Sequence, residues 1–225
     1  GLIAEGLFTE DDFDENGRLK EGIPKQNFSD ASNLRPGDIR YRDLNGDGEI
    51  TAVDETSIGG TSVPEIVYGF GATVRYKSID LGIFFQGTGN TDRILGGETW
   101  LPGSSLGAGN IYSNIDDRWT PENPNQNVFW PRMGDKAVAN NERPSTWWLR
   151  DMSFLRLKNL ELGYTLPPVW TNKIGVRNCR LFLRGTNLLT FSKFKLWDPE
   201  LETNDGLRYP QMKSISIGLS INFNN

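Results

Sequence analysis

The feature that most constrains the fold of this chain is a strict alternation of apolar and polar residues over positions 214–223. Successive side chains of a β-strand point to opposite faces, so a period of two predicts a strand with one apolar face. An amphipathic helix would instead repeat its apolar residues every three to four positions. The apolar positions of this predicted strand are Ile215, Ile217, Leu219, Ile221 and Phe223.

Four further stretches alternate in a similar way. Residues 66–76 and 79–86 are joined by the short turn Lys77-Ser78, which predicts a β-hairpin with one apolar face. Residues 153–167 form a long alternating stretch whose parity shifts part-way, and a β-bulge would reconcile its two halves. A fourth strand is expected near residues 177–190. The sequence therefore predicts an all-β, antiparallel fold.

The apolar faces of these strands could contact either lipid or a second sheet. No stretch of roughly 18 apolar residues is present, which excludes a membrane-spanning helix. A spanning strand needs only about 9–11 residues of alternating polarity, so the pattern is compatible with a transmembrane β-barrel. A soluble β-sandwich that buries the same face in its core would produce the same alternation.

The connections between the predicted strands favour the barrel. Long segments (1–65, 87–152 and 191–212) alternate strictly with short ones (77–78 and about 166–176). Outer-membrane barrels have short periplasmic turns and longer extracellular loops. We therefore expect an antiparallel transmembrane β-barrel whose long segments lie outside the cell.

This interpretation divides the chain into four parts. Residues 1–65 form an extracellular loop region, and residues 66–86 form a barrel hairpin. Residues 87–152 form a long, Trp-rich extracellular loop, and residues 153–225 carry the last barrel strands. About five strands cannot close a barrel, and open sheet edges are very costly in lipid, so the chain is expected to be a piece of a larger protein.

Composition argues against several classes of function. The formal net charge of −5 argues against a nucleic-acid binder. The absence of His removes the commonest general base and metal ligand, which argues against zinc chemistry and against Ser/His or Cys/His nucleophile pairs. Asp198 and Glu200 flank Pro199, but nothing suggests a second wall that would make them a hydrolase pair. We expect no enzymatic activity.

Two further features bear on the compartment. The single Cys179 cannot close a disulfide within this chain, so the redox environment is left open. The first residues, GLIAEGLFTE, do not have the form of a signal peptide. The expectation is either a cytoplasmic protein or a chain whose beginning is absent.

An ordered series of sequence segments runs through nearly the whole chain. The segments are PGDIRYRDLNGDGEIT (36–51), PEIVYGFG (64–71), IDLGIFFQGTG (79–89), RWTPENPN (118–125), SFLRLKNLELGYTLP (153–167), GTNLLTF (185–191), DPE (198–200) and YPQMKSISIGLSINF (209–223). No single segment is decisive, but the ordered set resembles the C-terminal part of SusC/RagA-type TonB-dependent outer-membrane transporters.

This resemblance implies an outer-membrane barrel of about 22 strands around an N-terminal plug. It also implies a SusD-type surface lipoprotein as partner, energy supplied through TonB, and an oligosaccharide or peptide as substrate. The present sequence contains no TonB-contacting segment and no plug, and nothing in it identifies the substrate. Our first hypothesis is oligosaccharide import. The alternative is a secreted, calcium-stabilised β-sandwich that binds carbohydrate.

One acidic stretch follows the template of a calcium-binding loop. Calcium needs several converging oxygen atoms, and a glycine at position 6 of the template permits the sharp turn that brings them together. The last position holds Asp where the template has Glu, which resembles dockerin-type loops. The alternative is a metal-free series of Asx turns. The candidate ligands for Ca²⁺ are Asp43, Asn45, Asp47, Glu49 and Asp54.

Aromatic and basic side chains are candidates for contacts with the substrate or the partner. The loop tryptophans could stack on sugar rings; alternatively, they pack a small core of the loop itself or contact the lipoprotein. Arg180 and Arg184 are expected on the polar, lumen-facing side of their strand. The tryptophans in question are Trp100, Trp119, Trp130, Trp147 and Trp148.

Overall fold

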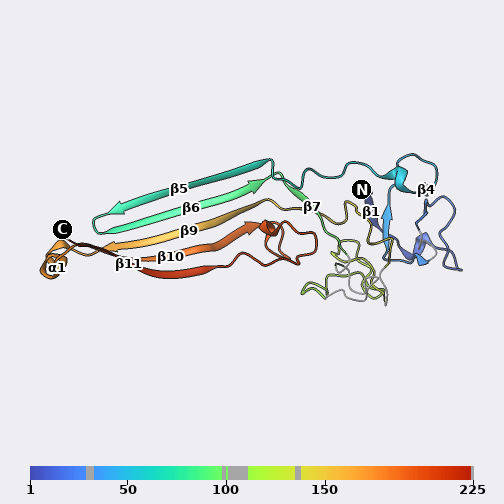
Figure 1. The fold of residues 1–225 in the computed structure, drawn as a ribbon. Coiled ribbons are helices and arrows are strands. Elements are labelled where there is room, and N and C mark those ends of the chain that lie inside the picture. The colour runs from blue at the N-terminus through green and yellow to red at the C-terminus, as the bar shows by residue number, and fades with distance from the viewer. Residues whose placement is uncertain (29–32, 98–99, 101–110, 135–137, 224–225) are drawn as a thin grey trace. The chain divides into compact units, whose positions relative to one another are not determined.

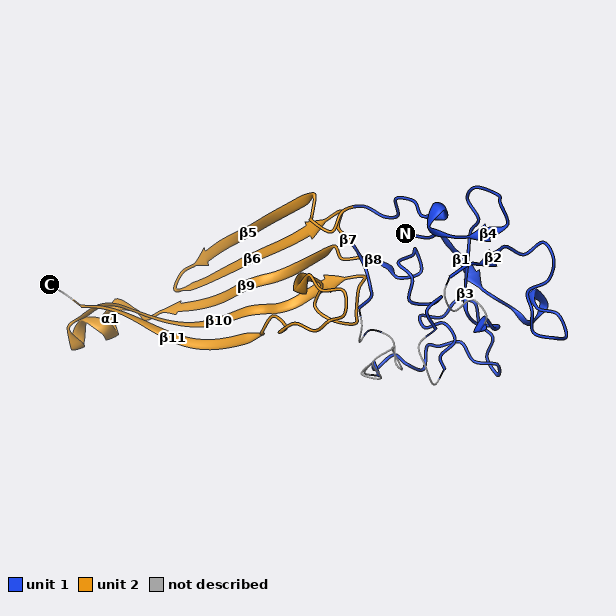
Figure 2. Cartoon of the chain, turned by 45° about the vertical axis from the view of Figure 1, so that its right-hand side comes forward, with its two compact units in different colours: residues 1–60, 93–150 blue, residues 61–92, 151–225 orange. Residues whose placement is uncertain are grey.

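The computed structural model describes residues 1–28, 33–97, 100, 111–134 and 138–223. These residues fall into two compact units, drawn in blue and orange in Figure 2. The first, here called the loop unit, comprises Gly1–Gly60 and Arg93–Arg150. The second, here called the sheet unit, comprises Thr61–Asp92 and Asp151–Asn225.

The sheet unit is built on a five-stranded antiparallel sheet with strand order β11-β10-β9-β6-β5 (Figure 1). Each of its strands coincides, apart from a few terminal residues, with a stretch that the period of two predicts to be a strand. The strands are β5 (Ile66–Tyr76), β6 (Ile79–Gly89), β9 (Phe154–Thr165), β10 (Val176–Ser192) and β11 (Ser214–Phe223).

The register of the sheet aligns apolar residues in rows across all five strands. One such row is Tyr76, Ile79, Tyr164, Leu181 and Leu219. Directly paired residues of antiparallel strands share a face, so these side chains belong to one apolar face. The adjacent row, on the other face, contains Arg75, Asp80, Gly163, Phe182 and Gly218. The sheet therefore has one apolar face and one polar face.

The apolar face is exposed. Ile215 and Ile217 of β11 expose 72% and 76% of their surface, and Val74 of β5 exposes 60%. Among the residues that the structure describes, every other sheet has only two strands. The pattern is not that of a β-sandwich, in which such residues would be buried between two sheets.

The predicted bulge lies in the middle of β9. The register between β9 and β6 shifts between Phe84 and Phe85, leaving Lys158 without a partner in either neighbouring strand. The matching shift in β10 lies at Asn187, which has a left-handed backbone (φ of 54°) and donates from Nδ2 to the Met212 carbonyl at 3.0 Å. The bulge explains why the apolar parity changes along residues 153–167.

Short helical segments lie in the connections. In the sheet unit, α1 (Pro168–Thr171) and the 3-10 turn Asn172–Ile174 connect β9 to β10, and the 3-10 turn Pro199–Leu201 lies between β10 and β11. The loop unit has 3-10 turns at Glu10–Asp12 and Ala52–Asp54. No helix within the described residues is long and apolar enough to cross a membrane.

The loop unit has little regular structure, and all its strands are short. The antiparallel pair β1 (Ala4–Leu7) and β3 (Ile39–Tyr41) forms one sheet. The parallel pair β2 (Lys25–Gln26) and β4 (Glu49–Ile50) forms another. A third two-stranded sheet pairs β7 (Asp92–Ile94) with β8 (Leu149–Asp151), whose outermost residues, Asp92 and Asp151, are counted with the sheet unit.

Candidate functional site

A network of four charged side chains occupies the polar face of the sheet. Arg180 Nε donates to Asp80 Oδ1 at 3.0 Å, and Arg180 Nη2 donates to Glu161 Oε1 at 2.8 Å. Arg184 Nε donates to the other oxygen of Glu161 at 2.7 Å. These residues belong to β6, β9 and β10, so the network connects three strands. Arg180 and Arg184, the two arginines that the sequence predicts on this face, are both part of it.

Gly163 allows Arg180 to reach across a whole strand. A Cβ atom at Gly163 would lie 2.3 Å from Arg180 Nη2, which shows that the guanidinium rests directly on the glycine backbone of β9. Phe182 covers Gly218 in the same way, and its ring lies 5.2 Å from the Arg180 guanidinium and 5.4 Å from that of Arg184. Glycines on this face thus give room to large side chains of the neighbouring strand.

We expect Gly163→Ala to uncouple Arg180 from Asp80, because the new methyl group occupies the place of the guanidinium. The free energy of unfolding should fall only slightly, because the flexible guanidinium can move aside and only a partly exposed ion pair is lost. In a double-mutant cycle with Asp80→Asn and Arg180→Met, the coupling between the two side chains should disappear in the Gly163→Ala background.

Gly82→Ala is the matched control on the same face. The nearest atom to a Cβ there is Thr73 Oγ1, at 3.8 Å, so this change should leave the coupling intact. A coupling that survives Gly163→Ala would show that the glycine is not needed for the bridge.

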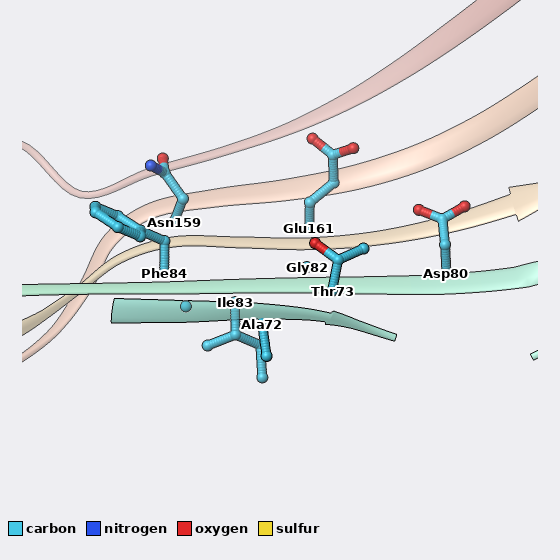
Figure 3. A pocket seen from close by; sticks show the side chains of 9 residues that line it. Ala72, Thr73, Asp80, Gly82, Ile83, Phe84, Asn159 and Glu161 are labelled. Carbon is cyan, nitrogen blue, oxygen red and sulfur yellow. The ribbon is translucent and has the colours of Figure 1, made fainter. Parts of the chain in front are cut away.

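A shallow hollow of about 530 Å³ adjoins the charged network. Figure 3 shows Thr73, Asp80, Phe84, Asn159 and Glu161 projecting from one side of the sheet, while Ala72 and Ile83 point to the other. The hollow lies on an open sheet face, and its described lining comes from β5, β6 and β9 alone. Such an open surface suits contact with a polar solute or polypeptide. Catalysis of bond formation or cleavage usually needs a more enclosed site.

Sequence reasoning missed the partners of the two arginines. Asp80 and Glu161, which bind the arginines, were not singled out, and neither was Asn159 of the hollow, although each lies on the polar parity of its own strand. That parity is the signal that could have found them. Which of them lies opposite which arginine depends on strand register, and register is not readable from one strand at a time.

The five loop tryptophans lie in the loop unit, and most of them are buried. Trp130 and Trp148 are fully buried, with ring centroids 5.9 Å apart, and Trp100 packs 5.0 Å from Trp130. Trp119 is also buried; Trp147 is half-buried and donates from Nε1 to the Phe129 carbonyl at 3.2 Å. The buried rings pack the core of the loop unit, the alternative that the sequence left open, and only Trp147 retains appreciable exposed surface.

The candidate calcium ligands are gathered in one tight loop. Asp43 accepts hydrogen bonds from the backbone N–H groups of Gly46 and Gly48 at 2.7 and 2.8 Å. Asp47 Oδ1 accepts from the Glu49 N–H at 2.9 Å, and Asn45 Oδ1 accepts from the Asp47 N–H. Within the described ranges, no group of three or more His, Cys, Asp or Glu side chains is arranged to hold a metal ion. In this arrangement the side-chain oxygens of Asp43, Asn45 and Asp47 accept hydrogen bonds mainly from backbone N–H groups of the loop.

Asp54 closes this loop. Its two oxygens accept from the backbone N–H groups of Leu44 and Thr51, each at 2.8 Å. Burial opposes ionisation, but the backbone donors, Thr51 first and then Leu44, outweigh it and hold the pKa of Asp54 below its ordinary value. The ionised carboxylate therefore connects the start of the loop to the 3-10 turn Ala52–Asp54.

A lowered folded-state pKa means that Asp54 stabilises the loop above the ordinary carboxyl pKa, and that this stabilisation is lost as the pH falls through the lowered value. We therefore expect pepsin to cleave the segment around residues 43–56 much faster at about pH 2 than at about pH 4, after correction for the activity of pepsin itself. In Asp54→Asn the segment should already be sensitive at the higher pH. Equal sensitivity of both proteins at both pH values would contradict this role.

Asp198 and Glu200, the carboxylates of the DPE segment, both bind Arg156. Arg156 Nη2 lies 2.5 Å from Asp198 Oδ1, and its Nε lies 3.3 Å from Glu200 Oε2. Arg156 is buried in β9, whereas the two carboxylates come from the connection between β10 and β11. The three side chains therefore fasten that connection to the sheet.

Comparison with known proteins identifies relatives over most of the chain. No family model matches it. It is 35% identical to TonB-dependent receptor P26 of Formosa agariphila, over 86% of this chain and 21% of the relative. It is 25% identical to TonB-dependent receptor SusC of Bacteroides thetaiotaomicron, over 85% of this chain and 18% of the relative. The chain thus spans about a fifth of the length of these curated relatives.

Solved structures share the fold. The RagAB peptide importer in its open-open state matches 99% of this chain and 22% of its own chain, with a TM-score of 0.67 and 23% sequence identity. The matched structure includes both the five-stranded sheet and the loop unit, since nearly the whole chain is covered.

Proposed function

Since this chain is homologous over most of its length to TonB-dependent receptors of the SusC/RagA type, we propose that it forms part of the barrel wall and outer loops of an outer-membrane importer. The proposed cargo is an oligosaccharide. The homologues carry receptor and transporter names, which agrees with the expectation that the protein is not an enzyme. The alternative of a secreted carbohydrate-binding sandwich finds no support among these relatives.

The observation that carries this proposal is the contrast between the two faces of the sheet. Rows of apolar residues cross all five strands on one face and are exposed, as in the row Tyr76, Ile79, Tyr164, Leu181 and Leu219. The opposite face carries the charged network and the polar hollow. Transmembrane barrels have this arrangement, with the apolar face toward lipid and the polar face toward the lumen.

The sheet also has two free edges. Within the described residues, β5 pairs only with β6, and β11 pairs only with β10. In a bilayer, unpaired backbone groups at such edges would cost several kcal/mol each, so further strands must pair with both. We infer that these strands lie elsewhere in the complete protein, in the roughly four-fifths that its relatives have in addition.

The proposed partners follow from the same relationship. A SusD-like surface lipoprotein would bind the outer loops, and TonB would act through a part of the protein that lies outside this chain. A peptide is the second candidate cargo, because the similar structure RagAB is named a peptide importer. The paired charges on the polar face suit hydrogen-bonding cargo of either kind.

Uptake measurements separate these candidates. Deleting the gene for the complete protein should abolish growth of its host on one class of oligosaccharide, and deleting TonB should have the same effect. Cells that lose uptake of labelled peptides but keep all oligosaccharide uptake would favour the second cargo. Unchanged uptake of both classes would refute the import function.

We propose that the loop of Asp43, Asn45, Asp47, Glu49 and Asp54 binds Ca²⁺ through its carboxylate, amide and carbonyl oxygens. The ion would rigidify an outer loop and take no part in chemistry. Removing calcium with a chelator should then speed proteolysis around residues 43–56, and adding Ca²⁺, but not Mg²⁺, should restore resistance. Asp47→Asn should weaken the calcium effect, whereas identical proteolysis with and without the ion would refute calcium binding.

A further inference from the structure

The end of the sheet that carries the short turns has an unusual surface. The β5–β6 turn and the segment after β9 lie at this end (Figure 1), and the Thr165 N–H donates to the Ser78 carbonyl at 2.7 Å between them. We call this surface the turn rim. It consists of three cations and three apolar residues, all exposed, namely Lys77, Lys173, Arg177, Val169, Trp170 and Ile174.

The three cations of the turn rim have no carboxylate partner among the described residues. The nearest acidic residue in the sheet register is Asp80, which is already bound by Arg180. Elsewhere in the sheet unit, by contrast, Lys158 of β9 and Lys193 after β10 form ion pairs with Glu200 and Asp151. The turn rim therefore presents uncompensated positive charge.

The apolar residues of the turn rim lie on the short helical turns after β9, and most of their surface is not packed against the protein. Val169, Trp170 and Ile174 expose 69%, 61% and 75% of their surface. On β5, β6 and β9 the rim follows the row that contains Tyr76 and Tyr164, which is the last apolar row of these three strands at this end. Exposed apolar side chains of the sheet and of the rim thus lie at the same end of the sheet unit, together with the three cations.

This combination matches the interface of a bilayer. Trp and Tyr prefer the depth of the lipid headgroups, and Lys and Arg there bind phosphate groups and are attracted to anionic lipids. If the apolar face of the sheet spans the hydrocarbon layer, as the proposed function requires, residues just past its last row lie at headgroup depth. We propose that the turn rim binds anionic phospholipids, holding their phosphate groups with Lys77, Lys173 and Arg177 while Trp170 enters the acyl boundary.

The test uses the complete protein reconstituted in bilayers of phosphatidylcholine. The fluorescence difference between wild type and Trp170→Phe isolates the signal of Trp170. A small fraction of phosphatidylglycerol or phosphatidylcholine, brominated on the upper acyl chain, serves as quencher. At low salt we expect brominated phosphatidylglycerol to quench Trp170 more strongly than brominated phosphatidylcholine does. The local enrichment of phosphatidylglycerol over phosphatidylcholine should be about fivefold for each cation that binds a lipid phosphate.

Charge-removing variants assign the preference to the rim. Lys77→Gln, Lys173→Gln and Arg177→Gln combined should abolish it while both lipids still quench. The matched control removes three cations from the connection before β11 (Lys195→Gln, Arg208→Gln and Lys213→Gln) and should leave it unchanged. Equal quenching by both lipids in the wild type, or none by either, would overturn the proposal.

The outcome also distinguishes this inference from the proposed function. A complete protein that fails to insert, judged by the loss of heat-modifiable migration on a gel, would refute the barrel itself. A protein that inserts but shows no lipid preference would refute only the lipid site. Binding of a soluble acidic protein to the rim, in place of lipid, would appear as protection of Trp170 from both brominated lipids.

Discussion

Replacing Asp38 by Asn is expected to lower the free energy of opening of the loop unit by about 3–5 kcal/mol, because it leaves a partly buried arginine without its counter-charge. Arg132 donates to both oxygens of Asp38 at 3.0 Å, and Asn141 Nδ2 donates to Oδ1 at 2.9 Å. The Arg35 N–H completes the shell at 2.9 Å. Asp38 is fully buried, so no water can replace it as the acceptor for these donors.

Burial raises the pKa of Asp38, and the Arg132 pair opposes that effect. Through Arg132 and Asn141, the Asp38 carboxylate connects segments about a hundred residues apart in the sequence. A second hydrogen bond joins the same segments, because Asn141 Oδ1 accepts from the Ile39 N–H at 2.9 Å. Native-state proteolysis of the complete protein, which measures the free energy of local opening, is the appropriate measurement.

Asp116→Asn is the matched control for Asp38. The side chain of Asp116 is 99% exposed and lies 3.6 Å from Arg118, so the same loss of one charge should change the opening free energy by less than about 0.5 kcal/mol. Equal, small effects of the two substitutions would show that the buried carboxylate does not organise the loop unit.

The second large effect concerns the clamp on Arg156. Replacing Asp198 by Asn and Glu200 by Gln together should destabilise the connection between β10 and β11 by about 3–5 kcal/mol, because the guanidinium is only 2% exposed and would lose both counter-charges. Hydrogen exchange of the backbone amides of residues 198–205 reports this opening directly.

A third substitution separates charge burial from simple loss of contacts. Adding Arg156→Met to the double variant removes the stranded charge and should recover a large part of the lost protection, since a buried ion pair can often be replaced by apolar residues at little cost. If the triple variant exchanges as fast as the double variant, burial of an unpaired guanidinium is not the cause of the instability.

The strands of the sheet unit were predictable because their signal is local. A period of two over residues 66–76 and 214–223 gives both the strand and its apolar face without knowledge of the neighbouring strands. The bulge in β9 was also visible, since the parity of its leucines changes between Leu157 and Leu160. The predicted resemblance to SusC/RagA-type receptors is confirmed by relatives that match most of the chain.

The candidate site was less predictable because its contacts depend on distant pairings. The bond between Asp80 and Arg180 joins residues 100 positions apart and needs Gly163 of a third strand beneath it. The ion pairs of Arg156 with Asp198 and Glu200 could be recognised only when the connection after β10 was placed against β9. Composition also does not distinguish a Trp that binds sugar from one that packs a core. The burial of Trp130 became visible only when the segments of the loop unit were placed around it.

The position of the sheet in an outer membrane is tested most directly by what each face of β11 contacts there. Spin labels at Ile217 and Leu219, and at their neighbours Ser216 and Ser220, can be placed one at a time in the complete protein in bilayers. We expect frequent collisions with oxygen dissolved in the acyl chains at 217 and 219, and with a water-soluble nickel complex at 216 and 220. Labels at 217 and 219 that are shielded from both reagents, as in the core of a soluble sandwich, would contradict this position.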